Sequence, residues 1–251
     1  AQNRERQRLM DEMVESARRE IAAVGEAPIY VLAGRQYLSG IAGLVASRIT
    51  DEFYRPSLVI AMDEKTSRGS ARSIEGLHIT HALDECKHLL NRYGGHAAAA
   101  GFDIANDNID ALRSILHSVA ERELTAEDLI PLLCIDMLLP LSDVNWDTWA
   151  LIEGMEPFGV GNPYPVFASY NVRVRDCRVV GRDGSTLKLA LSDGLSVWDA
   201  IAFRAGISPA QVPARIDVAY TLHPNVWNGR RSLQMHVRDI RPAGEAEPCQ
   251  Q

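Results

Sequence analysis

The most regular pattern near the start of the chain is a run of apolar residues spaced three or four positions apart among charged side chains. Over residues 3–24 the apolar positions are Leu9, Met13, Ala17, Ile21 and Val24. This spacing predicts an amphipathic helix that ends before Pro28. Residues 1–25 are therefore expected to form a connecting helix whose apolar stripe needs a packing partner.

Two short, continuous apolar runs follow, PIYVLA at residues 28–33 and SLVIAM at residues 57–62. Such runs are typical of strands that are buried on both faces. The segment between them has the apolar spacing of a helix, which favours a strand–helix–strand unit with parallel strands. Further helices are expected over 79–92 and 108–123. Residues 26–123 are thus predicted to form a compact α/β domain with a central sheet flanked by helices.

Five segments after about residue 165 alternate apolar and polar residues with a period of two: NVRVR, STLKLAL, VWDAIAF, RIDVAYTL and SLQMHV. Turn sequences such as RDGS, SDG and WNGR separate them, so the pattern predicts five short strands joined by tight turns. A five-stranded barrel of the oligonucleotide-binding (OB) type fits this pattern, although a small sandwich shares it. Residues 124–243 are expected to form a linker and an OB-like domain, and residues 244–251 a tail.

The net charge of −7 conceals an uneven distribution of charged residues. Residues 101–165 hold twelve Asp and Glu against two Arg, whereas residues 171–241 hold eleven Lys and Arg against six Asp. Binding to a phosphate backbone depends on local potential rather than on the overall sum. The C-terminal region is therefore compatible with a nucleic-acid partner.

Composition argues against several other classes of protein. No stretch of about 18 apolar residues indicates a membrane span, and the first residues lack the basic and apolar regions of a signal peptide. The four cysteines lie far apart without a CxxC pair, which argues against a zinc site and a disulfide framework. We expect a cytoplasmic protein without a membrane partner, and the missing initial Met suggests a fragment.

Two segments rich in small residues, SRGSARS (67–73) and NRYGGHAAAAGF (91–102), are candidate anion-binding segments. The first is expected to be a loop whose hydroxyls and forked guanidiniums could bind a phosphodiester, although such loops are often merely solvated. In the second, Gly94 and Gly95 bare backbone N–H groups beside His96, which suits an approaching anion. The alternative is close packing, with a Gly-Gly turn after a helix and then a small-residue helix against a sheet.

The predicted barrel offers cations and aromatic rings that could contact a nucleic-acid strand. Six residues are candidate DNA contacts: Arg173, Arg175, Lys188, Trp227, Arg230 and Arg231. The first three alternate with apolar residues and are expected to share the solvent face. Trp227 lies in a turn-like sequence and could either stack on a base or belong to the core. Trp198 and Phe203 are further aromatic candidates, and for Phe203 the core is the favoured interpretation.

Longer segments occur together in the order and at roughly the spacing of one known family: SGIAGLVASRITDEFYRPSLVIA, GSARS, LNRYGGHAAAAGF, MEPFGVGNPYPVF and WNGRRSLQMHVRDIRP. Over nearly its whole length the chain resembles the RecJ family of bacterial single-strand-specific 5′→3′ DNA exonucleases. The resemblance implies that residues 26–123 form a DHH-associated domain and that the family's OB domain follows it. It also implies that substrate phosphates are held by Ser70, Arg72, Ser73, Gly94, Gly95 and His96.

The family pattern is incomplete in this sequence. RecJ-like phosphoesterases hold two divalent metal ions, Mg²⁺ or Mn²⁺, in an N-terminal domain with an Asp-His-His triplet, and no such triplet occurs here. The resemblance therefore implies the substrate-binding C-terminal part of such an enzyme, which acts on single-stranded DNA in repair and recombination and releases 5′-mononucleotides.

We expect this part to be monomeric, to have no catalytic or metal-binding residue of its own, and to be inactive without the DHH domain. Two alternatives remain open. One is a stand-alone, non-catalytic module that binds single-stranded nucleic acid. The other is a DHH-family phosphodiesterase that acts on short oligonucleotides.

Overall fold

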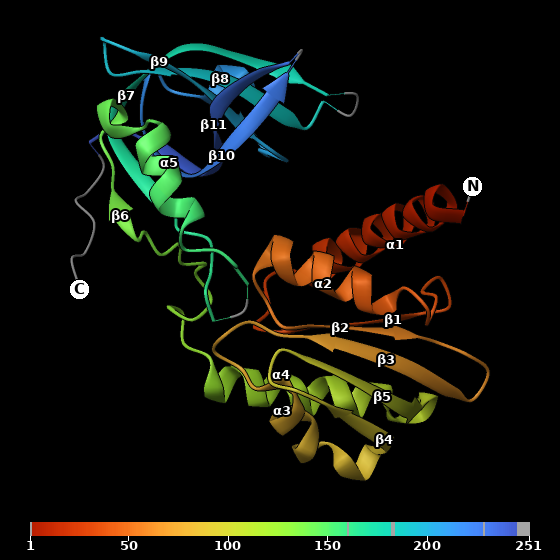
Figure 1. The fold of residues 1–251 in the computed structure, drawn as a ribbon. Coiled ribbons are helices and arrows are strands. Elements are labelled where there is room, and N and C mark those ends of the chain that lie inside the picture. The colour runs from red at the N-terminus through yellow and green to blue at the C-terminus, as the bar shows by residue number, and fades with distance from the viewer. Residues whose placement is uncertain (1, 160, 182–183, 228, 245–251) are drawn as a thin grey trace. The chain divides into compact units, whose positions relative to one another are not determined.

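The computed structural model describes residues 2–159, 161–181, 184–227 and 229–244. The chain divides into two compact units, Ala1–Leu132 and Leu133–Gln251. The first is a mixed α/β domain and the second contains a closed β-barrel (Figure 1). The predicted fold class is thereby confirmed. No helix within the described ranges is long and apolar enough to cross a membrane.

The first unit is built on a five-stranded sheet with the order β1-β2-β3-β5-β4. Its strands are β1 (Tyr30–Gly34), β2 (Ser57–Ala61), β3 (Thr66–Arg72), β4 (Leu90–Gly95) and β5 (Ala99–Ala105). β1 and β2 are parallel, as the two apolar runs predict, and the other neighbouring strands are antiparallel. The parallel pair requires a crossover, which α2 (Ala42–Phe53) provides.

Helices cover this sheet on both faces, with α1 (Gln2–Val24) and α2 on one face and α3 (Ile79–Glu85) and α4 (Ile109–Glu123) on the other (Figure 1). The predicted apolar stripe of α1 is buried at Met13, Ala17 and Ile21, together with apolar residues of α2, β1 and β2. On the other face, Phe102 and Ile104 of β5 share a second core with α3 and α4. Each face of the sheet thus has its own apolar core.

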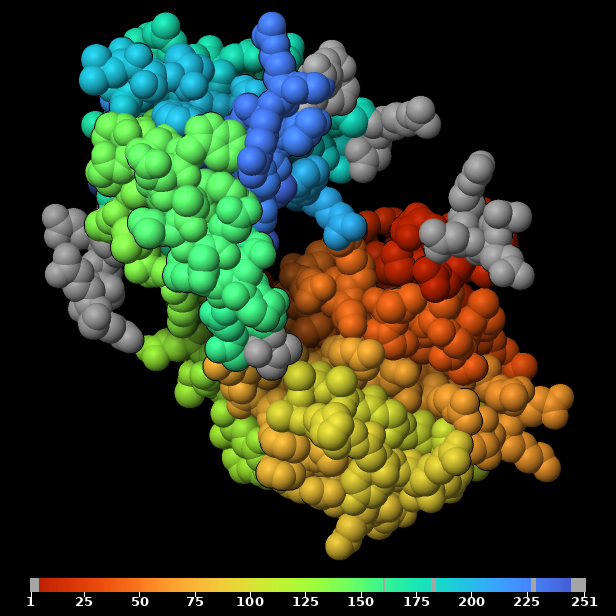
Figure 2. Space-filling view, in the orientation of Figure 1, coloured from red at the N-terminus to blue at the C-terminus, as the bar shows by residue number. Residues whose placement is uncertain are grey.

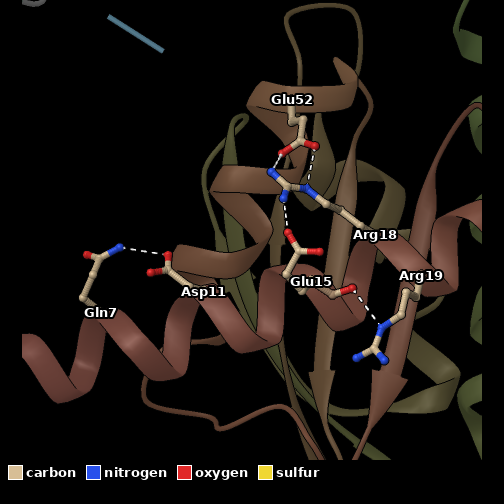
Figure 3. Close-up of polar contacts among 6 residues, drawn as sticks. All are labelled: Gln7, Asp11, Glu15, Arg18, Arg19 and Glu52. Atoms are coloured by element: carbon tan, nitrogen blue, oxygen red, sulfur yellow. Dashed lines mark hydrogen bonds and ion pairs between the residues drawn. The ribbon is translucent and has the colours of Figure 1, made fainter. Parts of the chain in front are cut away.

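An ion pair between the two helices accompanies the apolar contact of α1 with α2. Arg18 of α1 donates from Nε and Nη2 to the two carboxylate oxygens of Glu52 in α2, at 2.7 Å each, and also contacts Glu15 on its own helix (Figure 3). These side chains are partly exposed, so the pair adds little free energy of folding and the buried stripe supplies most of the stability. The fork geometry still orients α1 on α2.

Two predictions about the first unit are wrong. The segment 67–73, expected as a loop, lies mostly in β3 and pairs with β2 and β5. Ser67, Gly69 and Ala71 are small and buried on one face of the strand. Arg68, Ser70 and Arg72 belong to the other face. The strand period of two is therefore present, but apolar runs do not reveal it because the buried residues are small.

The second wrong prediction concerns residues 79–105. The helix expected over 79–92 ends at Glu85, and the chain then forms β4 and β5, a hairpin, in place of a Gly-Gly turn and a small-residue helix. Small residues suit this hairpin because Gly95 lies against the backbone of β5. A Cβ atom on Gly95 would lie 2.2 Å from the carbonyl oxygen of Ala99.

The second unit is a five-stranded barrel with one short additional strand. Its elements are β6 (Met137–Leu138), α5 (Trp146–Glu153), β7 (Phe167–Val180), β8 (Thr186–Ser192), β9 (Val197–Ala202), β10 (Arg215–Trp227) and β11 (Arg230–Pro242). The sheet order is β10-β11-β9-β8-β7-β6, and pairing of β10 with β7 closes the barrel. β9 and β11 are parallel, while the other neighbours within the barrel are antiparallel.

The linker before the barrel contains the short strand β6, the short helix α5 and a Gly/Pro-rich loop. Leu139, Leu141, Trp149 and Ile152 of this segment lie in the same apolar core as the barrel strands. The segment therefore covers part of the barrel (Figure 2). Four short 3₁₀ turns complete the described elements: η1 (Lys87–Leu89), η2 (Asn106–Asn108), η3 (Leu141–Asp143) and η4 (Pro209–Gln211).

We predict that Gly69→Ala destabilises the first unit by about 1–3 kcal/mol, because the added methyl group overpacks the core. Its Cβ would lie 2.1 Å from the ring of Phe102, which is 3 % exposed. Gly101→Ala is the matched control, since its Cβ would come no nearer than 3.9 Å to the Gly69 carbonyl oxygen. Thermal melting followed by far-UV circular dichroism should separate the two variants. Equal melting curves would contradict the packing role of Gly69.

Candidate nucleic-acid interface

The outer face of β3, β5 and β4 in the first unit carries most of the predicted phosphate-binding residues. On β1 and β2 this face is buried at Leu32 and Val59, which lie in the core shared with α1 and α2. Farther along the same sheet, Arg68 is exposed, and Ser70 and Arg72 are half-buried. The strand pairing arranges this open part of the face in rows that run across the three strands.

The middle row consists of Ser70, Gly101 and Gly94, which are paired in register across β3, β5 and β4. A Cβ added to Gly94 would have no heavy atom within 4 Å, so packing does not require this glycine. The row lines a hollow of about 330 Å³ in which the two glycines present bare backbone beside the Ser70 hydroxyl. This open backbone can be approached closely by a phosphate group.

The next row places one carboxylate between two guanidiniums. Asp103 of β5 pairs with Arg68 of β3, at 3.3 Å from Nε to Oδ1, and with Arg92 of β4. The side chain of Asp103 is 19 % exposed, while those of Arg68 and Arg92 are 59 % and 70 % exposed. Asp103 thus orients two exposed cations at the same hollow, and the row keeps a net positive charge.

The beginning of α2 lies beside Ser70 and Arg72. A Cβ atom on Gly43 would lie 3.2 Å from Arg72 Nη2 and 3.6 Å from Ser70 Oγ, so the glycine permits this close approach. The first turn of a helix carries partial positive charge, which reinforces the guanidinium beside it. Sequence reasoning missed Gly43 because nothing in SGIAG shows which strand its helix will meet. The one signal for Gly43 in the sequence was a glycine in the first turn of the predicted helix, where glycine lowers helix propensity.

The remaining predicted residues lie at the hairpin end of the face. His96 is exposed in the turn between β4 and β5, and its carbonyl oxygen accepts a hydrogen bond from Thr80 Oγ1 at 2.9 Å. Ser73 follows β3, and its N–H donates to Ala98 in this turn at 2.9 Å. The Ser73 hydroxyl donates to the Leu77 carbonyl oxygen at 2.7 Å, which gives it a structural partner.

On the barrel, Arg173 and Arg175 are exposed residues of β7. A bulge between Val174 and Asp176 interrupts the alternation, so Arg175 is the extra residue of that strand. Lys188 of β8 lies opposite Arg178 rather than opposite Arg173, and its Nζ contacts Asp199 at 3.0 Å. Arg178 is an exposed cation on this face that sequence reasoning did not single out.

The hairpin between β10 and β11 carries the other predicted barrel contacts. Arg230 is exposed at the start of β11 and has no ion pair with another described residue. Arg231 lies over the ring of Trp146 in α5, with 4.7 Å between Cζ and the ring centroid. Trp227 ends β10, and its side chain lies outside the part of the chain that is described.

Five rings form a continuous series, here called the ring column: Phe158, Tyr164, His223, His236 and Phe203. His223 and His236 stack at 4.2 Å between ring centroids, and Tyr164 stacks on His223 at 4.6 Å. Phe203 meets His236 edge to face at 5.4 Å. The expectation that Phe203 belongs to the core is wrong, since the residue is 57 % exposed just after β9.

Two family models match the chain, the DHHA1 domain over residues 26–122 and the RecJ OB domain over residues 135–239. The single-stranded-DNA-specific exonuclease RecJ of Bacillus subtilis is 32 % identical over 242 residues, 94 % of this chain and 31 % of that protein. The RecJ of Haemophilus influenzae is 34 % identical over 215 residues, 82 % of this chain and 37 % of that protein.

The crystal structure of RecJ from Thermus thermophilus in complex with Mn²⁺ superposes with a TM-score of 0.81 at 28 % identity. That match covers 98 % of this chain and 35 % of the other. The chain belongs to the RecJ family. The predicted resemblance is therefore confirmed, and the chain spans about a third of the length of the RecJ proteins it matches.

His, Cys, Asp and Glu are the side chains that hold divalent metal ions in proteins. Within the described ranges, no group of three or more of them is placed to hold a metal ion. The residues present here therefore do not fit the Mn²⁺ or Mg²⁺ that the solved relatives contain. What the described part of the chain offers is cations, hydroxyls, bare backbone and rings, which are groups that bind a strand.

We predict that the barrel loses stability as the pH falls from about 6.5 to about 4. Burial lowers the pKa of His223 to about 4, with smaller effects from His236 and Arg238, while burial and Arg238 lower the pKa of His236. Between the unfolded and folded pKa values, the unfolded chain binds a proton that the folded barrel does not, so acid favours unfolding.

Tryptophan fluorescence can measure this effect in the barrel unit, because all four tryptophans belong to it. His223→Phe keeps a ring in the column and removes one titrating group, so its melting temperature should depend less on pH over this range. His88→Gln, which removes an exposed imidazole of the first unit, is the control. An acid-induced loss as steep in His223→Phe as in the parent would contradict the assignment.

Proposed function

We propose that this chain is the substrate-binding DHHA1–OB region of a RecJ single-stranded-DNA-specific 5′→3′ exonuclease. In this proposal the open face of β3, β5 and β4 holds phosphates near the strand end, and the barrel binds the rest of the strand. The observation that carries it is the hollow where Ser70, the bare backbone of Gly94 and the paired cations Arg68 and Arg92 meet. These groups recognise a phosphodiester without reading a base.

Each part of this face has a distinct task in the proposal. The Arg72 guanidinium forms charge-assisted hydrogen bonds to phosphate oxygens, and the Ser70 hydroxyl donates one more. Gly94 leaves the backbone accessible, and Gly43 lets the positive end of α2 approach Ser70 and Arg72. Asp103 acts through Arg68 and Arg92, which it holds in place.

The relatives support the choice of substrate, since the curated proteins that match are named single-stranded-DNA-specific exonucleases. The reaction proposed for the whole enzyme is metal-dependent phosphodiester hydrolysis that releases 5′-mononucleotides during DNA repair and recombination. Because this chain lacks a fitting metal-ligand group among its described residues, we assign it binding and positioning, and we assign hydrolysis to a metal-binding DHH domain.

We predict that the chain binds single-stranded DNA more tightly than duplex DNA and that affinity falls as salt rises. Each strand phosphate that is neutralised contributes about −0.7 to the slope of log K against log salt, so a few contacts give roughly −2 to −3. Arg230→Ala should make the slope shallower by about 0.7. Arg19→Ala is the control, because Arg19 donates to the Glu15 carbonyl oxygen on its own helix (Figure 3).

Fluorescence anisotropy of labelled oligonucleotides at several salt concentrations measures both quantities. Equal affinity for single strand and duplex would contradict the proposed function. A slope unchanged in Arg230→Ala but changed in Arg19→Ala would contradict the assignment of the β10–β11 hairpin to the strand.

We predict that Arg72→Ala removes any preference for a 5′-phosphorylated over a 5′-hydroxyl oligonucleotide and weakens binding of the phosphorylated strand about tenfold or more. The reason is the loss of a charged hydrogen-bond donor, which is worth about 1.5–3 kcal/mol. Gly43→Ala should reduce the same preference, because its methyl group would lie 3.2 Å from Arg72 Nη2 and the guanidinium would have to shift by a few tenths of an ångström. It should not destabilise α2, since alanine favours a helix more than glycine does.

Lys87→Ala is the control for this experiment, because it removes an exposed cation of η1, outside the open sheet face. Competition between the two oligonucleotides gives the preference, and thermal melting gives the stability. A Gly43→Ala protein that melts lower but retains the full preference would contradict the role assigned to this glycine.

A further inference from the structure

The exposed end of the ring column has a structure that packing alone does not require. Phe203 follows β9 directly, and the next residue, Arg204, has a left-handed backbone with a φ of 51°. Both residues are exposed, although the neighbouring Ala202 is buried in the barrel core. The chain therefore turns sharply after β9 and leaves a phenyl ring beside a guanidinium-bearing residue on the outside of the barrel.

The other rings of the column pack behind the phenyl ring of Phe203. His236 is paired in register with Ile201 of β9, so its imidazole belongs to the outer face next to the end of that strand. His223 stacks behind His236, and Tyr164 stacks behind His223. The Tyr164 hydroxyl donates to the Leu222 carbonyl oxygen at 2.6 Å and anchors this end on β10.

The chemistry of the column suits an uncharged aromatic ligand next to anionic groups. The lowered pKa values keep both imidazoles neutral near pH 7, so the column supports the phenyl ring of Phe203 without adding positive charge. Two arginines belong to this region: Arg238 is one cause of the lowered pKa values of both imidazoles, and the exposed Arg204 follows Phe203 in the chain. An exposed phenyl ring followed by an arginine fits a nucleotide whose base stacks on the ring while its phosphate meets a cation.

We propose that Phe203, supported by His236, stacks on an unpaired base of the single-stranded DNA that the barrel binds. This inference rests on the proposed function and adds the contact that recognises bases, which the phosphate-binding residues cannot supply. Phe203 touches the strand, whereas His236 is a positioning residue that sets the orientation of the phenyl ring. Stacking tolerates any base, so the contact favours unpaired strands without selecting a sequence.

The test compares an oligo-dT strand with an abasic phosphodiester strand of the same length, which carries the same charges without bases. Phe203→Ala should weaken binding of the dT strand by about five- to a hundredfold. It should leave binding of the abasic strand and the salt slope unchanged, because stacking releases no counterions. Phe203→Trp should restore the affinity for dT.

Leu195→Ala is the matched control, since it removes an apolar side chain that is 94 % exposed in the β8–β9 turn, outside the ring column. For the positioning role, His236→Ala should weaken dT binding less than Phe203→Ala does, and His236→Phe should restore it. Tryptophan fluorescence of each variant checks that the barrel remains folded.

The outcomes separate this inference from the function on which it rests. A parent chain that binds neither strand overturns the proposed function. A parent chain that binds dT, together with a Phe203→Ala variant that binds it equally well, overturns only the stacking contact. If Phe203→Ala loses affinity equally for the dT and abasic strands, the stacking contact is also overturned, because that loss does not depend on a base. The same holds if Leu195→Ala loses as much affinity for dT as Phe203→Ala does.

Discussion

The contact between Gly69 and Phe102 is the constraint on which the candidate phosphate site depends. β3 has small residues on its buried face, so a large ring from the next strand fills the space beneath it. The core on the side of α3 and α4 is thereby complete without bulky residues in β3. Because that face supplies the stability, the opposite face can carry Arg68, Ser70 and Arg72 with little apolar cover.

The distribution of acidic partners explains how a chain of net charge −7 can offer a surface for a polyanion. Asp103 is shared between two arginines and aligns them. On the barrel, Asp199 pairs with Lys188 and Asp217 with Arg241, while Arg230 and Arg173 have no ion pair with another described residue. The electrostatic potential at this surface is set by these local pairings of acidic and basic side chains rather than by the net charge of the chain.

The linker before the barrel is part of the barrel's own structure. Its apolar residues join the barrel core, Trp146 receives the Arg231 guanidinium, and Tyr164 completes the ring column. Residues 137–166 are thus connected to the barrel core by the first contact and to the surface with the candidate strand contacts by the other two. If the barrel binds a strand as proposed, substitutions in the linker are expected to change that binding through these contacts.

The sequence by itself determined the elements whose side chains show a clear apolar period. α1, α2, β1, β2, α4 and the five barrel strands follow from such patterns, because burial of one face or one stripe selects apolar residues at a fixed spacing. The sequence motifs also identified the family, because several motifs in the family's order are more specific than any single motif. Only the tertiary structure showed that SRGSARS lies mostly in a strand and that GGH closes a hairpin. The small buried residues there carry no apolar signal of their own, because the bulk that packs against them comes from Phe102 on another strand. Gly43, the exposed position of Phe203 and the ring column depend in the same way on residues distant in sequence. Their proximity is decided by strand pairing and by the barrel's closure, which no local spacing records.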